Sequence, residues 1–179
     1  MKKLPLFLSL LVVTMLSLNN ASATPPSSNT ITGFWVSSAT VNSFANAGAV
    51  SLKVYASADD AGNYGYIMAG LDAAGNVIGG QTYMVGNKGI CPPSCEFSSM
   101  NTNGSTVEST TASANVDRYM SGNSGVNNCV TFTMTALTKV RTSTYIKISI
   151  GSSASAAGYN DSGTTTKTTA SGTASNDGM

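Results

Sequence analysis

In the stretch V-S-L-K-V-Y-A-S at residues 50–57, every second residue is apolar, beginning with Val50. A β-strand points successive side chains to opposite faces, so a period of two predicts a strand with one buried and one solvated face. The same alternation recurs in V-T-F-T-M-T-A at 130–136 and in T-Y-I-K-I-S-I at 144–150. These three segments predict an all-β protein.

Two similar pentapeptides separate strand candidates. D-D-A-G-N at 59–63 and D-A-A-G-N at 72–76 both begin with Asp and end with Gly-Asn. An Asp side chain accepts hydrogen bonds from the backbone just after it, and Gly or Asn tolerates positive φ, so both pentapeptides predict tight turns. Added carbonyl groups would let either one hold Ca²⁺, but neither has the alternating acids of an EF-hand loop. We therefore expect turns rather than calcium sites.

The other segments complete one antiparallel domain. Further strand candidates are residues 31–41, 64–71 and 77–85, with one or two weak strands within 105–116. Residues 138–141 are few enough to join the strands on either side as a hairpin or a bent ladder. The best helix candidate, residues 41–49, has a poor apolar stripe. We expect a single antiparallel β-sandwich or jelly-roll-like domain of about 7–9 strands.

The N-terminal residues have the pattern of a cleaved signal peptide. Residues 1–23 combine Lys2 and Lys3, an apolar run and the small residues A-S-A at their end. The run is shorter than the roughly 20 apolar residues of a membrane-spanning helix, so no integral membrane segment is expected after cleavage. We expect an exported bacterial protein, located outside the cell or on its surface, with the periplasm as an alternative.

Composition divides the remainder of the chain. Residues 24–30 contain two consecutive prolines and read as an extended leader, and residues 31–150 carry the apolar side chains of the β-sandwich domain. Residues 151–179 consist mainly of Ser, Thr, Gly, Ala and Asn. So few apolar side chains do not offset an ordering cost of about 1–2 kcal/mol per residue. The sequence therefore predicts a flexible low-complexity tail, with an edge strand at 164–170 as the alternative.

Three cysteines, Cys91, Cys95 and Cys129, fall in the part that is expected to be exported, where disulfides persist. Cys91 and Cys95 enclose two prolines, which stiffen the small ring that a bond between them would close. We expect Cys129 to pair with Cys91 or Cys95, which would stabilise the fold by about 3–4 kcal/mol. The spacing of three residues between Cys91 and Cys95, without histidine, argues against a redox or metal site.

The composition excludes several classes of function. The chain has no histidine, which removes the commonest general base and metal ligand. No Ser-x-x-Lys or phosphate-binding glycine motif is present. The eight acidic residues read as solvated surface groups, and a net charge of +1 offers no basic patch for nucleic acid. We expect no catalytic residues, no cofactor, no metal and no nucleic-acid partner.

Aromatic side chains supply candidate contact residues. The candidates for ligand stacking or an interface are Phe34, Trp35, Tyr64, Tyr66 and Tyr83. Aromatic rings can stack on sugars, but cross-strand aromatic pairs also stabilise sheets without a ligand, and packing is the favoured interpretation.

Two functions are therefore expected from the sequence. The first is a non-catalytic structural or adhesive protein of the cell surface or matrix that self-associates into a fibre. In this interpretation residues 31–41 are the strand most suited to pair with a neighbouring subunit, and burial in the protein's own core is the alternative. The second function is a secreted module that binds a glycan or another ligand.

Overall fold

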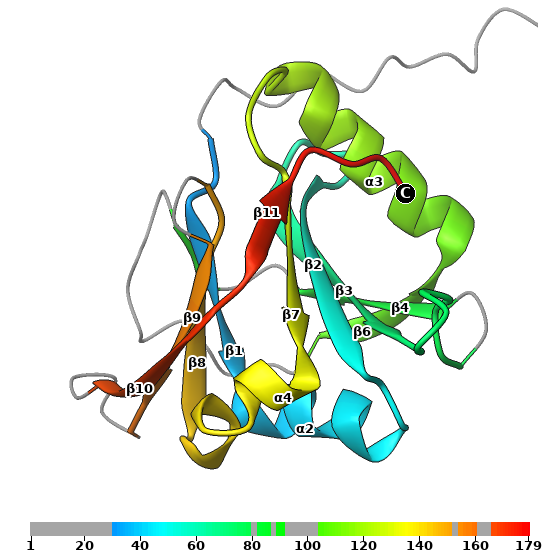
Figure 1. Ribbon diagram of the computed structural model, residues 1–179. Coiled ribbons are helices and arrows are strands. Elements are labelled where there is room, and N and C mark those ends of the chain that lie inside the picture. The colour runs from blue at the N-terminus through cyan, green and yellow to red at the C-terminus, as the bar shows by residue number, and fades with distance from the viewer. Residues whose placement is uncertain (1–29, 80–81, 87–88, 92–103, 152–153, 161–165) are drawn as a thin grey trace, which may run out of the picture.

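Two antiparallel sheets lie face to face in the computed structural model, which describes residues 30–79, 82–86, 89–91, 104–151, 154–160 and 166–179 (Figure 1). The five-stranded sheet runs in the order β10 (Thr166–Ser171), β9 (Ser155–Tyr159), β8 (Tyr145–Ser149), β1 (Gly33–Ser37) and β5 (Ile90–Cys91). The six-stranded sheet runs in the order β11 (Thr173–Ser175), β7 (Cys129–Thr133), β2 (Ser51–Ala58), β3 (Tyr64–Leu71), β4 (Thr82–Gly86) and β6 (Ser105–Glu108). The predicted all-β sandwich is confirmed, with eleven strands in the described residues.

The main core lies between the two sheets. Its side chains come from alternate positions of the central strands, among them Phe34, Val36, Ile146, Ile148, Leu52, Val54, Val130 and Phe132. Each of these is almost fully buried, and burial of one such side chain contributes about 1.5–3 kcal/mol. The period of two in the sequence therefore corresponds to one face of each strand in this core.

The hairpin formed by β2 and β3 is the centre of the six-stranded sheet. Its register runs from Ser51 opposite Leu71 to Ala58 opposite Tyr64, and the predicted turn at 59–63 closes it. After β3 the chain makes the second predicted turn, and Val77 forms an isolated bridge with Leu71. The expected strand at 77–85 differs in extent, because β4 begins only at Thr82 and pairs with the middle of β3.

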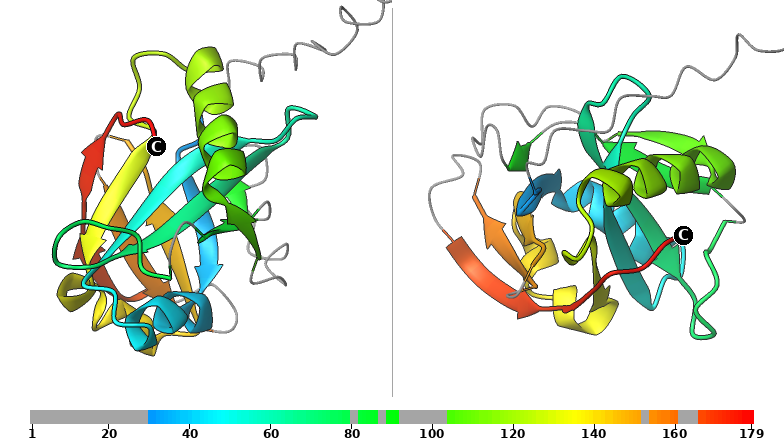
Figure 2. Two further views of the ribbon diagram at one scale, coloured as in Figure 1. Left: turned by 90° about the vertical axis from the view of Figure 1, so that its right-hand side faces the viewer. Right: turned by 90° about the horizontal axis from the view of Figure 1, so that it is seen from above.

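Helix α3 (Ser109–Gly122) covers the outer face of the six-stranded sheet (Figure 2). A second cluster joins Ala112 and Val116 of α3 to Tyr55, Ile67 and Cys129 of the sheet. The weak strands expected within 105–116 are wrong beyond Glu108, where the helix begins. The buried residues of α3 are spaced four and three apart, as on one face of a helix. The other residues of the helix are mainly polar, including several Ser and Thr, so this helical pattern was not recognised in the sequence.

Short helical segments at one end of the sandwich shorten two expected strands (Figure 1). Helix α2 (Ser38–Asn46) follows β1 directly, because the Ser37 hydroxyl accepts a hydrogen bond from Thr40 N at 3.1 Å and caps the helix. Helix α4 (Met134–Leu137) follows β7 in the same way, with Thr133 as its cap. The expected strands at 31–41 and 130–136 therefore end at the two capping residues.

The chain passes from one sheet to the other after β7. Helix α4 and the 3₁₀ helix η2 (Val140–Thr142) carry it from the six-stranded sheet to β8 in the five-stranded sheet. The hairpin or bent ladder expected at 138–141 is therefore wrong, because β7 and β8 are not neighbours.

The segment after residue 150 forms strands in both sheets. Strand β9 pairs with β8, β10 pairs with β9, and β11 pairs with β7. These segments hydrogen-bond to existing strands although their side chains are small, and β10 corresponds to the edge strand that was the alternative to a flexible tail at 164–170. Gly172 lets the chain cross between the sheets, since a Cβ there would lie 2.6 Å from the Phe132 ring.

Some expectations concern residues that the structure does not describe. The signal peptide at 1–23 and the leader, except for residue 30, lie outside the described residues, as does Cys95. Within the described ranges, no helix has the length and apolarity that a bilayer crossing requires.

Candidate functional site

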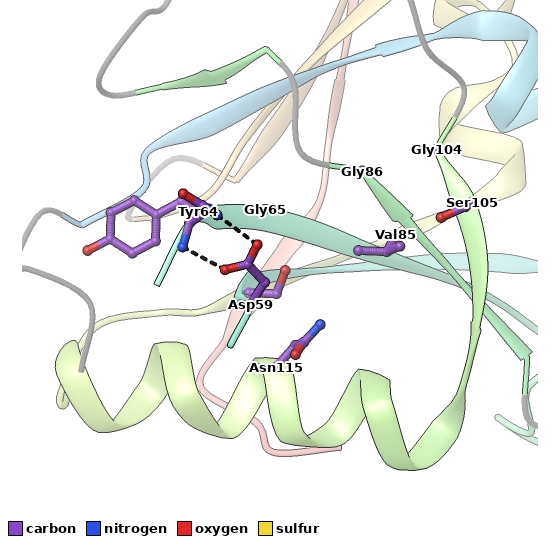
Figure 3. Close-up of a pocket in the computed structure, with 10 residues that line it drawn as sticks. Asp59, Tyr64, Gly65, Val85, Gly86, Gly104, Ser105 and Asn115 are labelled. Atoms are coloured by element: carbon purple, nitrogen blue, oxygen red, sulfur yellow. Dashed lines mark hydrogen bonds between the residues drawn. The ribbon is translucent and has the colours of Figure 1, made fainter. Parts of the chain in front are cut away.

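A pocket of about 350 Å³ opens between α3 and the outer face of the six-stranded sheet (Figure 3). This volume is within the range of about 300–1,000 Å³ that is usual for small-molecule sites. Its polar side chains are those of Ser57, Asp59, Asn63, Ser105 and Asn115. They come from the end of β2, the first turn, the start of β6 and the middle of α3, so the pocket exists only in the folded domain.

Asp59 lies at one side of the pocket and organises the first turn. Its Oδ1 accepts hydrogen bonds from the backbone N–H groups of Ala61 at 2.9 Å and Asn63 at 2.8 Å. The Asn63 side chain donates to Oδ2 at 2.9 Å (Figure 3). Three donors therefore hold the carboxylate in one orientation, which is the turn chemistry that the sequence predicted.

The Asp59 carboxyl is ionised over a wide pH range. Partial burial favours its protonated form, but the hydrogen bonds from Asn63 and Ala61 and the positive charge of Arg118 outweigh this effect. Together they hold the pKa of Asp59 below its ordinary value. The pocket consequently presents a negative charge to any ligand.

Asn115 projects into the pocket from α3, opposite Asp59 (Figure 3). Arg118, one turn along the same helix, donates from one terminal nitrogen to Asn115 Oδ1 at 2.9 Å and to the Ala58 carbonyl at 2.7 Å. Its other terminal nitrogen forms an ion pair with Asp60. Arg118 thus ties α3 to the first turn and fixes the position of Asn115.

Ser57 is the most deeply buried polar side chain of the pocket. The residue is 2% exposed, and no described residue forms a hydrogen bond with its hydroxyl. It lies on the face of β2 that is turned toward α3, near Gly65, where an added Cβ would approach its oxygen to 3.1 Å. Among the described residues, the enclosed side-chain polar atoms that lack a partner are those of Ser38, Arg141 and Ser143, so the Ser57 oxygen borders the open space of the pocket instead. The vacant bonding capacity of Ser57 is therefore available to a ligand or to water.

Glycines form the strand side of the pocket. Gly65 and Gly86 lie on adjacent strands, and a Cβ on Gly65 would approach the Gly86 carbonyl to 2.8 Å. Gly104 has φ +73°, and a Cβ there would lie 2.2 Å from the Val85 carbonyl. Larger residues at these positions would fill the pocket or displace the strands, so the absence of side chains is what keeps it open.

Two of the predicted contact residues lie in the core. Phe34 and Tyr66 pack against each other with their ring centroids 5.1 Å apart. Burial raises the pKa of Tyr66 to about 12. Their positions agree with the packing interpretation rather than with ligand stacking.

The other three predicted contact residues lie on different surfaces. Trp35, on the outer face of the five-stranded sheet, is 6% exposed and packs against Tyr159 with ring centroids 4.7 Å apart. Tyr83 packs against the cluster beneath α3. Tyr64 lines the pocket, but its ring is directed away from the other lining side chains and packs edge-on against Tyr119 (Figure 3). Sequence reasoning named only this residue of the pocket as a contact, and it missed Ser57 and Asn115.

Cys129 is a free thiol, so its expected pairing with Cys91 or Cys95 is wrong. It lies in β7, whereas Cys91 is disulfide-bonded and lies in β5 of the opposite sheet. The Cys129 sulfur is 3.0 Å from the Ser175 hydroxyl, and burial raises the pKa of the thiol. A buried, protonated thiol is a packing group rather than a nucleophile.

Among the described residues that line the pocket, Asp59 is the one acidic side chain. Within the described ranges, His, Cys, Asp and Glu nowhere gather in a group of three that could hold one. The oxygens of Asp59 already accept three hydrogen bonds, and those of Asp72 in the second turn are occupied in the same way.

In comparisons with known proteins, the chain matches no family model, no curated protein and no solved structure.

Proposed function

We propose that this is an exported, non-catalytic protein of the cell surface or extracellular space that acts adhesively, by binding a glycan in the pocket between α3 and the six-stranded sheet. The signal-like residues 1–23 support export. The pocket supports binding, since it brings together hydroxyl, carboxylate and amide groups around a space large enough for a sugar.

The observation that carries the proposal is the Ser57 hydroxyl, which lines the pocket and forms no hydrogen bond with any described residue. Its donor and its acceptor positions are therefore both open to a group that enters the pocket. A sugar hydroxyl is the natural partner, because it can donate to the serine oxygen or accept from it.

The charge of the site restricts the class of ligand. Asp59 is negatively charged, and the nearby cation, Arg118, is already occupied by Asp60, Asn115 and the Ala58 carbonyl. An anionic ligand would meet repulsion without a free positive group to offset it. Neutral glycans meet no such penalty.

Self-association has less support from the geometry. Strand β1, within the segment expected to join a neighbouring subunit, is paired with β8 along its whole length and with β5 at Gly33 and Phe34. Phe34 and Val36 are buried in the protein's own core. A fibre would therefore need a different contact surface.

The test is to measure binding of the exported protein to an immobilised panel of neutral and acidic glycans. We expect Ser57→Ala to weaken binding about fivefold to tenfold, because one hydrogen bond is lost. Ser51→Ala, at the opposite end of the same strand, is the matched control and should bind like the unmodified protein. Failure to bind any glycan of the panel would contradict the proposal.

A further inference from the structure

The polar groups of this pocket indicate which type of sugar it binds. This inference rests on the proposed function, glycan binding. We propose that Arg118 fixes Asn115 as a hydrogen-bond donor opposite the acceptor Asp59, so that the pocket selects neutral sugars with two adjacent free hydroxyls over acidic or aminated sugars. In this arrangement Arg118 is a positioning residue, and Ser57, Asp59 and Asn115 contact the sugar.

The orientation of the Asn115 amide follows from its partner. A guanidinium group can only donate hydrogen bonds, so the atom 2.9 Å from Arg118 must be the amide oxygen. The Asn115 amide nitrogen is consequently not used by Arg118, and no described residue accepts a hydrogen bond from it. In Figure 3 this nitrogen is turned toward the strand that carries Val85. Asn115 therefore offers a donor to the pocket.

Arg118 cannot easily release this orientation. Its guanidinium side chain is 16% exposed and has three partners: Asn115, the Ala58 carbonyl and Asp60. The Ala58 carbonyl comes from the last residue of β2, so the guanidinium is anchored to the sheet as well as to α3. The pair of Arg118 and Asn115 is thus held as one unit beside the first turn.

Asp59 offers the opposite polarity. An ionised carboxylate only accepts, and it has about four positions for donors. Two backbone amides occupy Oδ1, and the Asn63 side chain occupies one position on Oδ2. One position on Oδ2 is left, and a ligand must bring a donor to use it.

These polarities match one type of ligand group. A sugar hydroxyl both donates and accepts, so one hydroxyl can donate to Asp59 while its neighbour accepts from Asn115, and Ser57 can serve either. A carboxylate brings only acceptors and a charge that Asp59 repels. An ammonium group brings only donors, which suits Asp59 but leaves the Asn115 nitrogen unpaired. The pocket therefore favours a pair of neutral hydroxyls.

The test uses methyl glucoside and two probes that each differ from it at one group, methyl glucuronide and methyl glucosaminide. Their affinities for the unmodified full chain are measured by NMR titration. We expect the neutral glucoside to bind tightest and the glucuronide to bind at least about tenfold more weakly, since it keeps the ring hydroxyls but carries a carboxylate that Asp59 repels.

Variants of Arg118 and Asn115 show whether Arg118 orients the Asn115 amide or only supports the fold. Asn115→Asp keeps an oxygen for Arg118 but removes the donor, and we expect about tenfold weaker binding of the glucoside. Arg118→Ala frees the amide to turn its oxygen into the pocket, so the preference should move toward the glucosaminide, and Arg118→Lys should restore part of the original preference. Asp60→Ala is the control, because Arg118 keeps its bonds to Asn115 and Ala58.

The outcomes distinguish this inference from the proposed function. If the glucoside binds but the glucuronide binds as well or better, or if Asn115→Asp changes nothing, the inference is overturned while glycan binding stands. If neither these probes nor any glycan of the panel binds the unmodified protein, both the inference and the proposed function fail.

Discussion

The turns at 59–63 and 72–76 have nearly the same sequence and the same internal structure, but they lie in different surroundings. In each turn the Asp Oδ1 accepts from two backbone amides, at 2.9 and 2.8 Å. In each, the final Asn donates its side chain to the Asp Oδ2, and Gly has φ near +80 to +86°. Five residues are enough to determine this local structure, wherever it stands in the chain.

The difference between the turns comes from the rest of the fold. The first turn lies beside α3, where Arg118, Asn115 and Ser57 add a pocket to it. The second turn leads from β3 to the Val77 bridge and is not among the residues that line the pocket. Identical turn chemistry thus contributes to a candidate binding site in one place and only to chain reversal in the other.

The largest expected effect is on ligand binding. Asp59→Asn should weaken glycan binding about 10- to 100-fold, because the ligand loses the charged carboxylate that accepts its hydrogen bond. Asp72→Asn, the matched change in the second turn, should leave binding unaltered. Isothermal titration of both variants with the tightest neutral glycan checks the pair, and equal losses in the two would remove the functional distinction between the turns.

The next effect concerns stability and should be equal in the two turns. Gly62 and Gly75 have φ +80° and +86°, and a Cβ on Gly75 would meet no atom within 4 Å. Gly62→Ala and Gly75→Ala should each lower the free energy of unfolding by about 1 kcal/mol through backbone strain alone. Asn at either position should lower the free energy of unfolding by less than Ala does, since Asn tolerates positive φ. Urea unfolding measures all four variants, and a neutral Gly75→Ala would show that the strain argument is wrong.

A smaller effect is expected in acid. Hydrogen bonds from Asn76 lower the pKa of Asp72, and those from Asn63, against partial burial, lower the pKa of Asp59. A carboxyl whose pKa is lower in the folded state stabilises the fold above its unfolded pKa of about 3.9, and this contribution disappears as the pH falls through the folded pKa. Unfolding curves of Asp72→Asn and of the unmodified protein should therefore differ at pH 7 and converge at low pH. A constant difference across the range would contradict this assignment.

The smallest effect on stability and glycan affinity is expected at the one position at which the two turns differ in sequence. Asp60 of the first turn corresponds to Ala73 of the second. The side chain of Asp60 is 92% exposed, so its ion pair with Arg118 should contribute no more than about 1 kcal/mol. Asp60→Ala should leave both stability and glycan affinity almost unchanged. A large loss of affinity would instead mean that Asp60 itself makes the first turn functional.

Local features of this chain could be predicted from its sequence. The alternation in 50–57 and 144–150 specified strands that face a core, and the Asp-Gly-Asn pattern specified both turns, because each depends only on residues close in the chain. Helix α3 was missed because Ala112 and Val116 are small or isolated among Ser and Thr. Its burial depends on the sheet beneath it, which no local pattern reveals.

Features that depend on distant residues could not be predicted. The strands after residue 150 are ordered by pairing with β8 and β7, although their composition resembles a flexible tail. The pocket unites Ser57, Asp59 and Asn115, which are polar residues without a shared motif. Their significance appears only when the fold places an unpaired hydroxyl, an acceptor and an oriented donor around one space.

The central claim is that the first turn, and not the second, belongs to a binding site for a neutral glycan. The most direct measurement is an NMR titration of the isotope-labelled protein with methyl glucoside, followed at the amide groups of both turns. The account predicts shifts at Asn63, Gly65 and Asn115 that saturate together, with Asn76 unaffected. Saturable shifts at Asn76, or binding that leaves Asn63 and Asn115 unchanged, would contradict it.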